Sequence, residues 1–202
     1  GPLGQGCGNA VGMALAEAML AAKFNREGFN IVDHRTYVIA GDGDLMEGIS
    51  HEAFSLAGHM GLHKLIVFYD SNRITIEGGT DLAYSDNVRK RFEGYNWNVL
   101  EIDGHDMAAI QSALDAARKE NQRPTLIIGH THIAKGSPHL QDSSESHGSP
   151  LGVEEVKATK RAIGLPPDQE FWIPDDVKSA FAERRQVLEA ERTRWNGLCA
   201  AY

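Results

Sequence analysis

Long apolar runs, cysteines and clusters of basic residues are all scarce in this 202-residue sequence. No apolar run approaches the roughly 18 residues that a membrane helix needs, so we expect no membrane span. The two cysteines, Cys7 and Cys199, lie near opposite ends of the chain. This favours free thiols in a reducing, cytoplasmic compartment over a disulfide framework. The longest basic cluster is residues 89–91 and the formal net charge is -8, which argues against a nucleic-acid partner.

What the sequence does contain is an alternation of two kinds of segment. Short β-branched or apolar segments alternate with longer segments whose apolar residues recur at helical spacing. Such alternation predicts an α/β fold with an open, mostly parallel sheet and helices on both faces. The expected strands span residues 36–40, 65–69, 97–102 and 125–128, and the expected helices span residues 8–24, 47–60, 87–94, 106–120, 153–163 and 175–195.

The chain is expected to divide into two parts of unequal size. Residues 1–170 would form the α/β domain, incomplete at its N-terminus, and residues 171–202 a helical linker toward a following domain. The polar stretch of residues 129–150 is rich in His, Ser and Gly. It is too long for a simple connector, and loops of this length in compact domains are usually functional or disordered.

The strongest chemical signal follows the first two expected strands. Asp42 stands between two glycines directly after the first strand, and Asn72 follows the second. Neighbouring parallel strands end at the same edge of a sheet, so we expect the two residues side by side where ligands bind. A carboxylate, an amide oxygen and a main-chain carbonyl suit Mg²⁺, which completes its coordination with phosphate oxygens and water. The helix expected from residue 47 would aim its N–H groups at the same place, so the sequence predicts a metal-bridged diphosphate.

A Gly-Asp-Gly motif followed at this distance by Asn resembles the signature of thiamine-diphosphate enzymes. The wider sequence is similar to the transketolase family over nearly the whole chain, and the similarity becomes weak after about residue 180. The segments that carry it are GPLGQG and NAVGMALAEA near the start, GDGDLMEGISHEAFSLAGHMGLHKLIVFYDSNRITIEG (residues 41–78), IAKGSP (residues 133–138) and HGSPLG (residues 147–152).

The resemblance implies the thiamine-diphosphate-binding fold and a role for particular residues of this chain. Asp42, Asn72 and the main-chain carbonyl of Ile74 would hold Mg²⁺ or Ca²⁺, and the Gly43 N–H would bind the diphosphate. Glu47 would belong to a buried acidic network that couples active sites across a dimer. The other implied cofactor contacts are Gly1 and Leu3 at the aminopyrimidine, Ile76 and Ile133 at the cofactor rings, and His147 beside the diphosphate and the reacting centre.

His147 and Glu47 are the catalytic candidates, and each also has a simpler interpretation. His147 fits a hydrogen-bonded histidine in a Gly/Ser-rich loop. Glu47 fits a favourable charge in the first turn of a helix, which is worth about 0.3–1 kcal/mol. No catalytic role is expected for the other histidines. Their spacing along the chain also does not match that of zinc ligands.

The family resemblance implies reversible transfer of a two-carbon ketol group from a ketose phosphate to an aldose phosphate, as in the pentose phosphate pathway or the Calvin cycle. Sugar phosphates are the expected substrates, and the expected assembly is a homodimer or a complex with a chain that carries the pyrimidine-binding domain. Family segments with further active-site histidines and the activating glutamate are not among these 202 residues. We therefore expect the isolated chain to be inactive and to self-associate or be marginally stable. Turnover of xylulose 5-phosphate with ribose 5-phosphate would refute the first expectation.

Three alternative functions fit the sequence less well. Dihydroxyacetone synthase and deoxyxylulose-phosphate synthase share the cofactor, but the text MEGISHEAFSLAGH favours transketolase over the latter. A non-catalytic interaction module of the same fold would have no need to keep Asp42, Gly43 and Asn72. A nicotinamide-dependent dehydrogenase would need G-x-G-x-x-G after the first strand, and residues 41–46 lack the third glycine.

Overall fold

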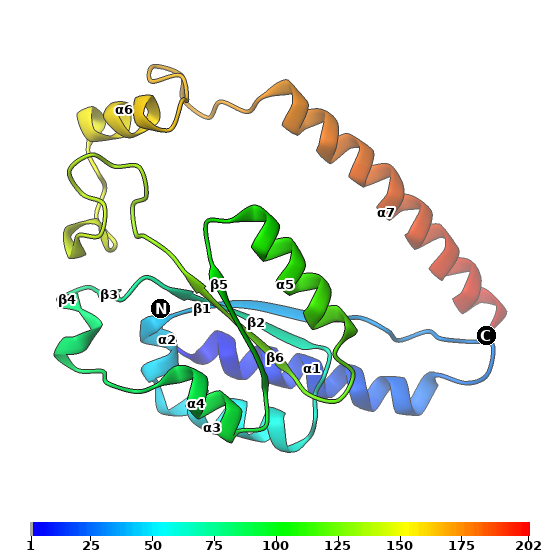
Figure 1. The fold of residues 1–202 in the computed structure, drawn as a ribbon. Coiled ribbons are helices and arrows are strands. Elements are labelled where there is room, and N and C mark those ends of the chain that lie inside the picture. The colour runs from blue at the N-terminus through cyan, green and yellow to red at the C-terminus, as the bar shows by residue number, and fades with distance from the viewer. Residues whose placement is uncertain (1) are drawn as a thin grey trace.

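Four parallel strands form the central sheet of the computed structural model, which describes residues 2–202 (Figure 1). All three neighbouring pairs of strands run parallel, so the prediction of an α/β fold with an open parallel sheet is confirmed. A separate antiparallel pair, β3 (Ile74–Thr75) and β4 (Gly78–Gly79), follows the second strand. Across the sheet the strands are, in order, β1 (Thr36–Gly41), β2 (Leu65–Ser71), β6 (Thr125–His130) and β5 (Asn98–Asp103).

Helices cover both faces of this sheet (Figure 1). Side chains of β2 alternate between the two faces, because successive residues of a strand point in opposite directions. Leu65 and Val67 join the larger apolar core, whereas Ile66 joins the smaller core on the other face. Strands that are apolar on both sides are typical of a buried parallel sheet. The helices of the larger core are α1 (Gln5–Phe24), α3 (Gly48–His59) and α4 (Val88–Gly94), and α5 (Met107–Lys119) packs on the smaller one.

The helix expected over residues 47–60 is present as α3 (Gly48–His59), and a second, short helix that was not expected precedes it. A short helix, α2 (Asp42–Met46), follows β1 directly, and α3 begins only at Gly48. Glu47 lies between them with extended backbone angles, φ -67° and ψ 138°. An extended residue cannot continue a helix, so Glu47 caps α3, and the helix that starts at the Gly-Asp-Gly turn is α2.

Three aromatic rings form the centre of the larger core. The ring centroids of Phe54, Phe92 and Trp97 lie 5.3, 5.2 and 5.1 Å apart in tilted or edge-to-face pairs. The Trp97 indole N–H donates to the Phe54 carbonyl oxygen at 2.8 Å. A Cβ at Gly58 would lie 1.8 Å from the Tyr95 carbonyl oxygen. Helix α3 therefore approaches this cluster only because residue 58 has no side chain.

The outer face of the edge strand β1 is open. Ile39 is 78% exposed in the middle of the strand, and Tyr37 is half-exposed. Arg118 of α5 reaches this face, where its Nε–H donates to the Tyr37 hydroxyl oxygen at 3.1 Å. Apolar side chains that are open to water agree with self-association or marginal stability of the isolated chain, which stays a prediction.

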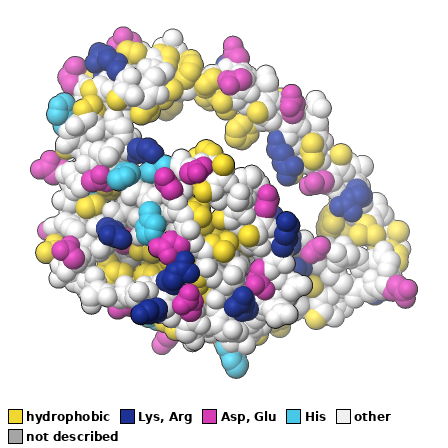
Figure 2. Space-filling view, viewed as in Figure 1, with side chains coloured by type: hydrophobic (Ala, Val, Ile, Leu, Met, Phe, Trp, Pro, Cys, Tyr) yellow, Lys and Arg dark blue, Asp and Glu magenta, His cyan; other side chains and the backbone are white. Residues whose placement is uncertain are grey.

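The C-terminal part of the chain forms an arch beside the α/β body (Figure 1). The arch consists of α6 (Val153–Ala162) and α7 (Asp175–Ala201), and neither helix has a buried residue. Figure 2 shows an opening between the arch and the body. Within residues 2–202, no helix combines the length and the apolar character needed to cross a membrane.

The far end of α7 returns to the body near the end of α1. The Trp195 indole N–H donates to the Ile31 carbonyl oxygen at 2.9 Å, and the Arg26 guanidinium donates to the Tyr202 carbonyl oxygen at 2.6 Å. The helix thus extends beyond its expected end at residue 195. The division into a domain of residues 1–170 and a linker of residues 171–202 stays a prediction.

The close approach of α3 gives the first testable prediction. Gly58→Ala is expected to lower the free energy of unfolding by at least about 2 kcal/mol, because the new Cβ overlaps a backbone carbonyl that cannot move freely. Gly12→Ala in α1 is the control, since a Cβ there meets nothing within 4 Å. It is expected to raise the same free energy by up to about 1 kcal/mol. Urea denaturation measures both, and equal stabilities of the two variants would contradict this packing.

Candidate functional site

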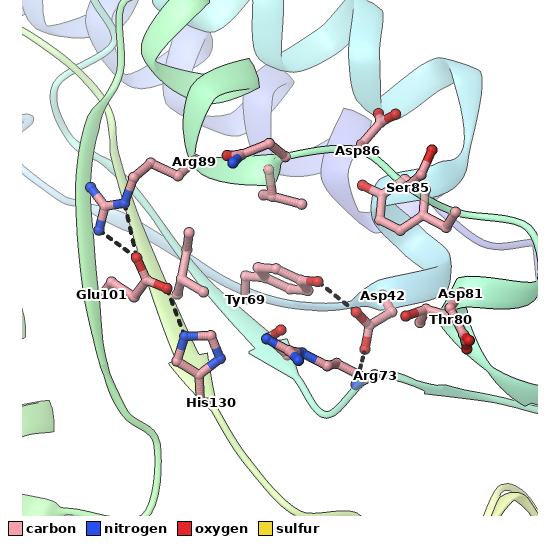
Figure 3. A pocket seen from close by; sticks show the side chains of 15 residues that line it. Asp42, Tyr69, Arg73, Thr80, Asp81, Ser85, Asp86, Arg89, Glu101 and His130 are labelled. Atoms are coloured by element: carbon pink, nitrogen blue, oxygen red, sulfur yellow. Dashed lines mark hydrogen bonds and ion pairs between the residues drawn. The ribbon is translucent and has the colours of Figure 1, made fainter.

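Polar residues gather where the parallel strands end. The register pairs Gly41 of β1 with Asp70 of β2, so the segments that follow these residues leave the sheet together. Strands β5 and β6 end at the same edge, because all four strands are parallel. The residues just beyond the strand ends are 42–44, 72–74, 104–106 and 131–132, and Figure 3 shows part of this edge.

Asp42 is the buried acid of this edge, with 5% of its surface exposed. The Tyr69 hydroxyl donates to its Oδ1 at 2.5 Å, and the backbone N–H of Arg73 donates to its Oδ2 at 3.0 Å (Figure 3). Both donors are neutral. Burial raises the pKa of the Asp42 carboxyl above its usual range, and these hydrogen bonds offset only part of that effect.

A tight turn after β2 brings Asn72 and Ile74 to the same place. Arg73 adopts a left-handed backbone conformation with φ 62° in this turn, and its N–H donates to the Asp42 carboxylate. The Asn72 side-chain oxygen accepts from the Ile74 N–H at 3.0 Å. The Asp42 carboxylate therefore contacts the residue between Asn72 and Ile74. Joint binding of a metal ion by the three residues stays a prediction.

The N-terminal turn packs against the start of α2 and α3. A Cβ at Gly43 would lie 3.1 Å from a methyl carbon of Leu3, so the Leu3 side chain lies over Gly43. Gly4 has φ 73°, and a Cβ there would lie 2.8 Å from the Glu47 Cβ. The structure thus brings Leu3, Gly43 and the Cβ of Glu47 together beside Asp42. Gly1, another expected contact, lies outside the described residues.

The Glu47 side chain is exposed in this chain. Its place at the start of α3 differs from the expected place in the first turn of a helix, because Glu47 precedes that turn. The buried acidic network expected across a dimer would require a second surface to cover this side chain, and it stays a prediction.

Three further expected contacts lie on exposed or half-buried loops. Ile76, in the turn between β3 and β4, is 69% exposed. Ile133 is half-buried in the long loop after β6. His147 is exposed, and its backbone N–H donates to the Ser144 carbonyl oxygen at 2.9 Å, at the end of the short 3-10 helix Ser144–Ser146. Their roles toward a cofactor stay predictions.

Two adjoining cavities open at the edge of the sheet. One, of about 460 Å³, has Asp42 in its lining, and the other, of about 570 Å³, has Asn72. Both are lined by Ser71, Arg73 and His130, so the two expected metal ligands border neighbouring cavities that share these residues. The two linings do not include the expected ring contacts Leu3, Ile76 and Ile133, nor His147, which was expected beside the diphosphate.

A charged network lies on the far side of the first cavity and was not expected from the sequence (Figure 3). The Arg89 guanidinium donates to Glu101 at 2.7 Å, and the His130 ring lies 2.7 Å from the other Glu101 oxygen. These partners, His130 first, hold the pKa of the Glu101 carboxyl below its usual range. The network ties α4 to β5 and β6, and the separations along the chain give no sequence signal for it.

Glu155 of α6 anchors the long loop that carries Ile133 and His147, and this was also missed. Its carboxylate accepts hydrogen bonds from the Ser137 hydroxyl and from the His139 N–H, the latter at 3.0 Å. The His139 ring lies 2.8 Å from its second oxygen. The Ser137 hydroxyl, the His139 ring and the His139 N–H hold the pKa of the Glu155 carboxyl at about 2.

The fold and its polar edge define a ligand-binding domain of the open α/β type, in which the site lies beyond the carboxyl ends of the strands. The family model described as "Transketolase, thiamine diphosphate binding domain" matches residues 1–202. The chain therefore belongs to the transketolase family, in which it corresponds to that domain.

Curated relatives and solved structures agree with this family assignment. Transketolase 1 of Vibrio cholerae is 51% identical and transketolase of Bacillus subtilis is 48% identical, each over 100% of this chain. The structure of transketolase from Leishmania mexicana superposes with a TM-score of 0.97 at 44% identity, again over 100% of this chain. The chain spans 30% of the Vibrio protein, 31% of the Bacillus protein and 30% of the Leishmania chain.

The anchor of the long loop predicts a pH dependence. A depressed carboxyl pKa stabilises the folded state above the ordinary value of 4.5, and this contribution is lost as the pH falls toward about 2. The Glu155→Gln variant has no carboxylate at this position that acid could protonate. Its free energy of unfolding is therefore expected to fall less between pH 5 and pH 3 than that of the unaltered chain. Urea denaturation across this range measures the difference.

Glu154→Gln, on the exposed side of the same helical turn, is the matched control for removing one charge. It is expected to keep the full acid dependence of the unaltered chain. An acid dependence that is the same in both variants would show that Glu155 does not anchor the loop.

Proposed function

We propose that this chain binds thiamine diphosphate through a divalent ion at the carboxyl ends of β1 and β2, as the diphosphate-binding part of a transketolase. The reaction would be reversible transfer of a two-carbon ketol group from a ketose phosphate to an aldose phosphate. The observation that carries the proposal is the buried Asp42 carboxylate, whose two hydrogen-bond donors are both neutral.

Such a carboxylate fits a cation. Removing an ionised carboxylate from water costs several kcal/mol unless an opposite charge or enough donors compensate. Each oxygen of Asp42 accepts one hydrogen bond and keeps further lone-pair capacity. A divalent ion beside it would favour the ionised form and so act against the rise in pKa that burial causes.

The neighbouring oxygen donors suit magnesium or calcium. Asn72 offers an amide oxygen and Ile74 a main-chain carbonyl, and both belong to the turn that contacts Asp42. Oxygen-only ligand sets select hard ions such as Mg²⁺ and Ca²⁺. Across residues 2–202, no three His, Cys, Asp or Glu side chains are grouped around one point, so the proposed ion would depend on the amide and main-chain oxygens beside Asp42.

The diphosphate would lie on the backbone at the start of α2. Gly43 has no side chain, and Leu3 lies 3.1 Å from the position that a Cβ would take, so only a residue without a Cβ fits beside Leu3 at this turn. The Gly43 N–H would donate to the diphosphate. Leu3 would face the aminopyrimidine, together with Gly1, as the family resemblance implies.

The remaining assignments concern the rings and the reacting centre. Ile76 and Ile133 would pack on the cofactor rings, and His147 would lie beside the diphosphate and the substrate. Glu47 would enter the acidic network at a dimer interface. Bound thiamine diphosphate would supply the electron sink for breaking and forming the carbon–carbon bond, while this chain binds and orients it.

The proposal extends to the assembly in which the chain works. Sugar phosphates would be the substrates in a cytoplasmic enzyme, and a homodimer or a second chain would supply the pyrimidine-binding domain. Because this chain spans about 30% of its relatives, we expect no appreciable ketol transfer from residues 1–202 alone.

Isothermal titration calorimetry with thiamine diphosphate and Mg²⁺ tests the binding step directly. The chain is expected to bind the cofactor only when Mg²⁺ is present, and chelation of the metal should abolish the signal. Asp42→Ala is expected to weaken binding by roughly 100-fold or more, because the ion loses its carboxylate ligand.

Asp81→Ala is the matched control, since it removes an acid that lines the same cavity and has no proposed contact with the ion. It should change the affinity by less than about threefold, as expected for a partly screened charge. Equal affinities of the Asp42 and Asp81 variants, or no binding by the unaltered chain, would overturn the proposed function.

A further inference from the structure

One carboxylate joins two turns of the candidate site that are far apart in the sequence. Asp44 Oδ1 accepts from the Gly4 N–H at 2.9 Å, and Oδ2 accepts from the Gly41 N–H at 3.0 Å. Gly4 belongs to the N-terminal turn, whereas Gly41 ends β1. Hydrogen bonds from N–H groups to an ionised carboxylate are shorter and stronger than neutral ones, so this bridge is a firm link.

Each turn carries a residue that the proposed function assigns to one end of the cofactor. Leu3, next to Gly4, would face the aminopyrimidine. Asp42 and Gly43, next to Gly41, would hold the ion and the diphosphate. The Asp44 carboxylate therefore links Leu3, which would face the ring, to Asp42 and Gly43, which would hold the ion and the diphosphate.

The N-terminal turn packs closely against the residues around Asp44. A Cβ at Gly4 would lie 2.8 Å from the Ser50 Oγ and 2.8 Å from the Glu47 Cβ, so the turn presses directly on the start of α3. The Ser50 hydroxyl in turn donates to the Asp44 carbonyl oxygen at 2.6 Å. The Ser50 hydroxyl thus holds the main chain of Asp44, whereas the Gly4 and Gly41 amides hold its carboxylate.

A simpler role for Asp44 is to cap the first turn of α2. Its bond to the Gly41 N–H has the geometry of a capping box, which stabilises a helix start locally. The bond to the Gly4 N–H goes beyond that role, because it crosses to a segment 40 residues earlier.

We propose that Asp44 is a positioning residue for cofactor binding, which holds Leu3 over Gly43 by bridging the Gly4 and Gly41 amides. This inference rests on the proposed function. A cap alone would affect every ligand of the α2 turn equally. A bridge affects ligands that touch both turns more than ligands that touch only the metal and diphosphate side.

Two probes separate these effects in the unmodified 202-residue chain and its variants. Thiamine diphosphate with Mg²⁺ would contact both turns, whereas inorganic pyrophosphate with Mg²⁺ would contact only the side of Asp42 and Gly43. Asp44→Ala is expected to weaken thiamine diphosphate about 10-fold more than it weakens pyrophosphate, in calorimetric titrations. Asp44→Asn should give a similar selective loss with a smaller effect on folding, because its amide has one acceptor oxygen where the bridge needs two.

Ser50→Ala is the matched control, because it removes the hydroxyl bond to the Asp44 main chain and leaves the carboxylate in place. It is expected to change the two affinities by the same factor. Equal losses for both ligands in the Asp44 variants would reduce Asp44 to a helix cap and overturn the proposal.

Amide hydrogen exchange of the unliganded chain tests the bridge without any ligand. The Gly4 and Gly41 amides are expected to exchange about 10-fold faster in Asp44→Ala than the change in global stability explains, and not in Ser50→Ala. Should the unaltered chain bind neither probe, the proposed function fails. In that case hydrogen exchange alone tests the Asp44 bridge. An exchange rate at the Gly4 amide that does not change in Asp44→Ala would then overturn the bridge as well.

Discussion

A carboxylate that is buried among neutral donors is the constraint on which this site depends. Asp42 keeps only 5% of its surface exposed, and an ionised group in that position requires hydrogen bonds from its own fold. Tyr69 and the Arg73 backbone supply them from β2 and from the turn that follows it. Both donors reach Asp42 because β1 and β2 pair in a register that sets Gly41 opposite Asp70. A slip of one residue would turn Tyr69 to the other face of the sheet and leave Asp42 without its hydroxyl donor.

The same packing that stabilises the sheet therefore shapes the site. Leu65, Val67 and Tyr69 share one face of β2 and enter the larger core together. The two aliphatic side chains fix that face against the helices, and the phenol at the end of the series carries its hydroxyl to the strand end. Burial strongly raises the pKa of Tyr69, and the hydrogen bond to Asp42 adds to that rise, so Tyr69 remains a donor over the accessible pH range. The three side chains lie on the same face because alternate residues of a strand point in the same direction.

Sequence reasoning predicted what depends on short-range pattern and missed what depends on long-range contact. The strands and the common edge of Asp42 and Asn72 follow from apolar runs that end in polar residues. Helix α2, and the break at Glu47 that separates it from α3, could not be read in this way, because residues 42–60 contain no proline and keep helical spacing of apolar residues. Packing of Gly4 against the Glu47 Cβ and the Ser50 Oγ accompanies that break, and it involves a segment more than 40 residues earlier. The contacts of Asp44 with Gly4 and of Glu155 with Ser137 and His139 have the same character: no periodicity links their partners.

The distribution of burial separates the proposed site into a formed half and an open half. Asp42 and its donors are fixed by the sheet, whereas Leu3 is 54% exposed and Ile76 is 69% exposed. Apolar side chains that are open to water on one side can cover only one face of a flat ring, so the ring of a bound cofactor would stay partly solvated on this chain. Ion and diphosphate contacts would then contribute most of the affinity, since they lie in the half that needs no further surface. The exposed His147 and Glu47 belong to the open half as well, and chemistry at the ring would require a second surface that closes over them.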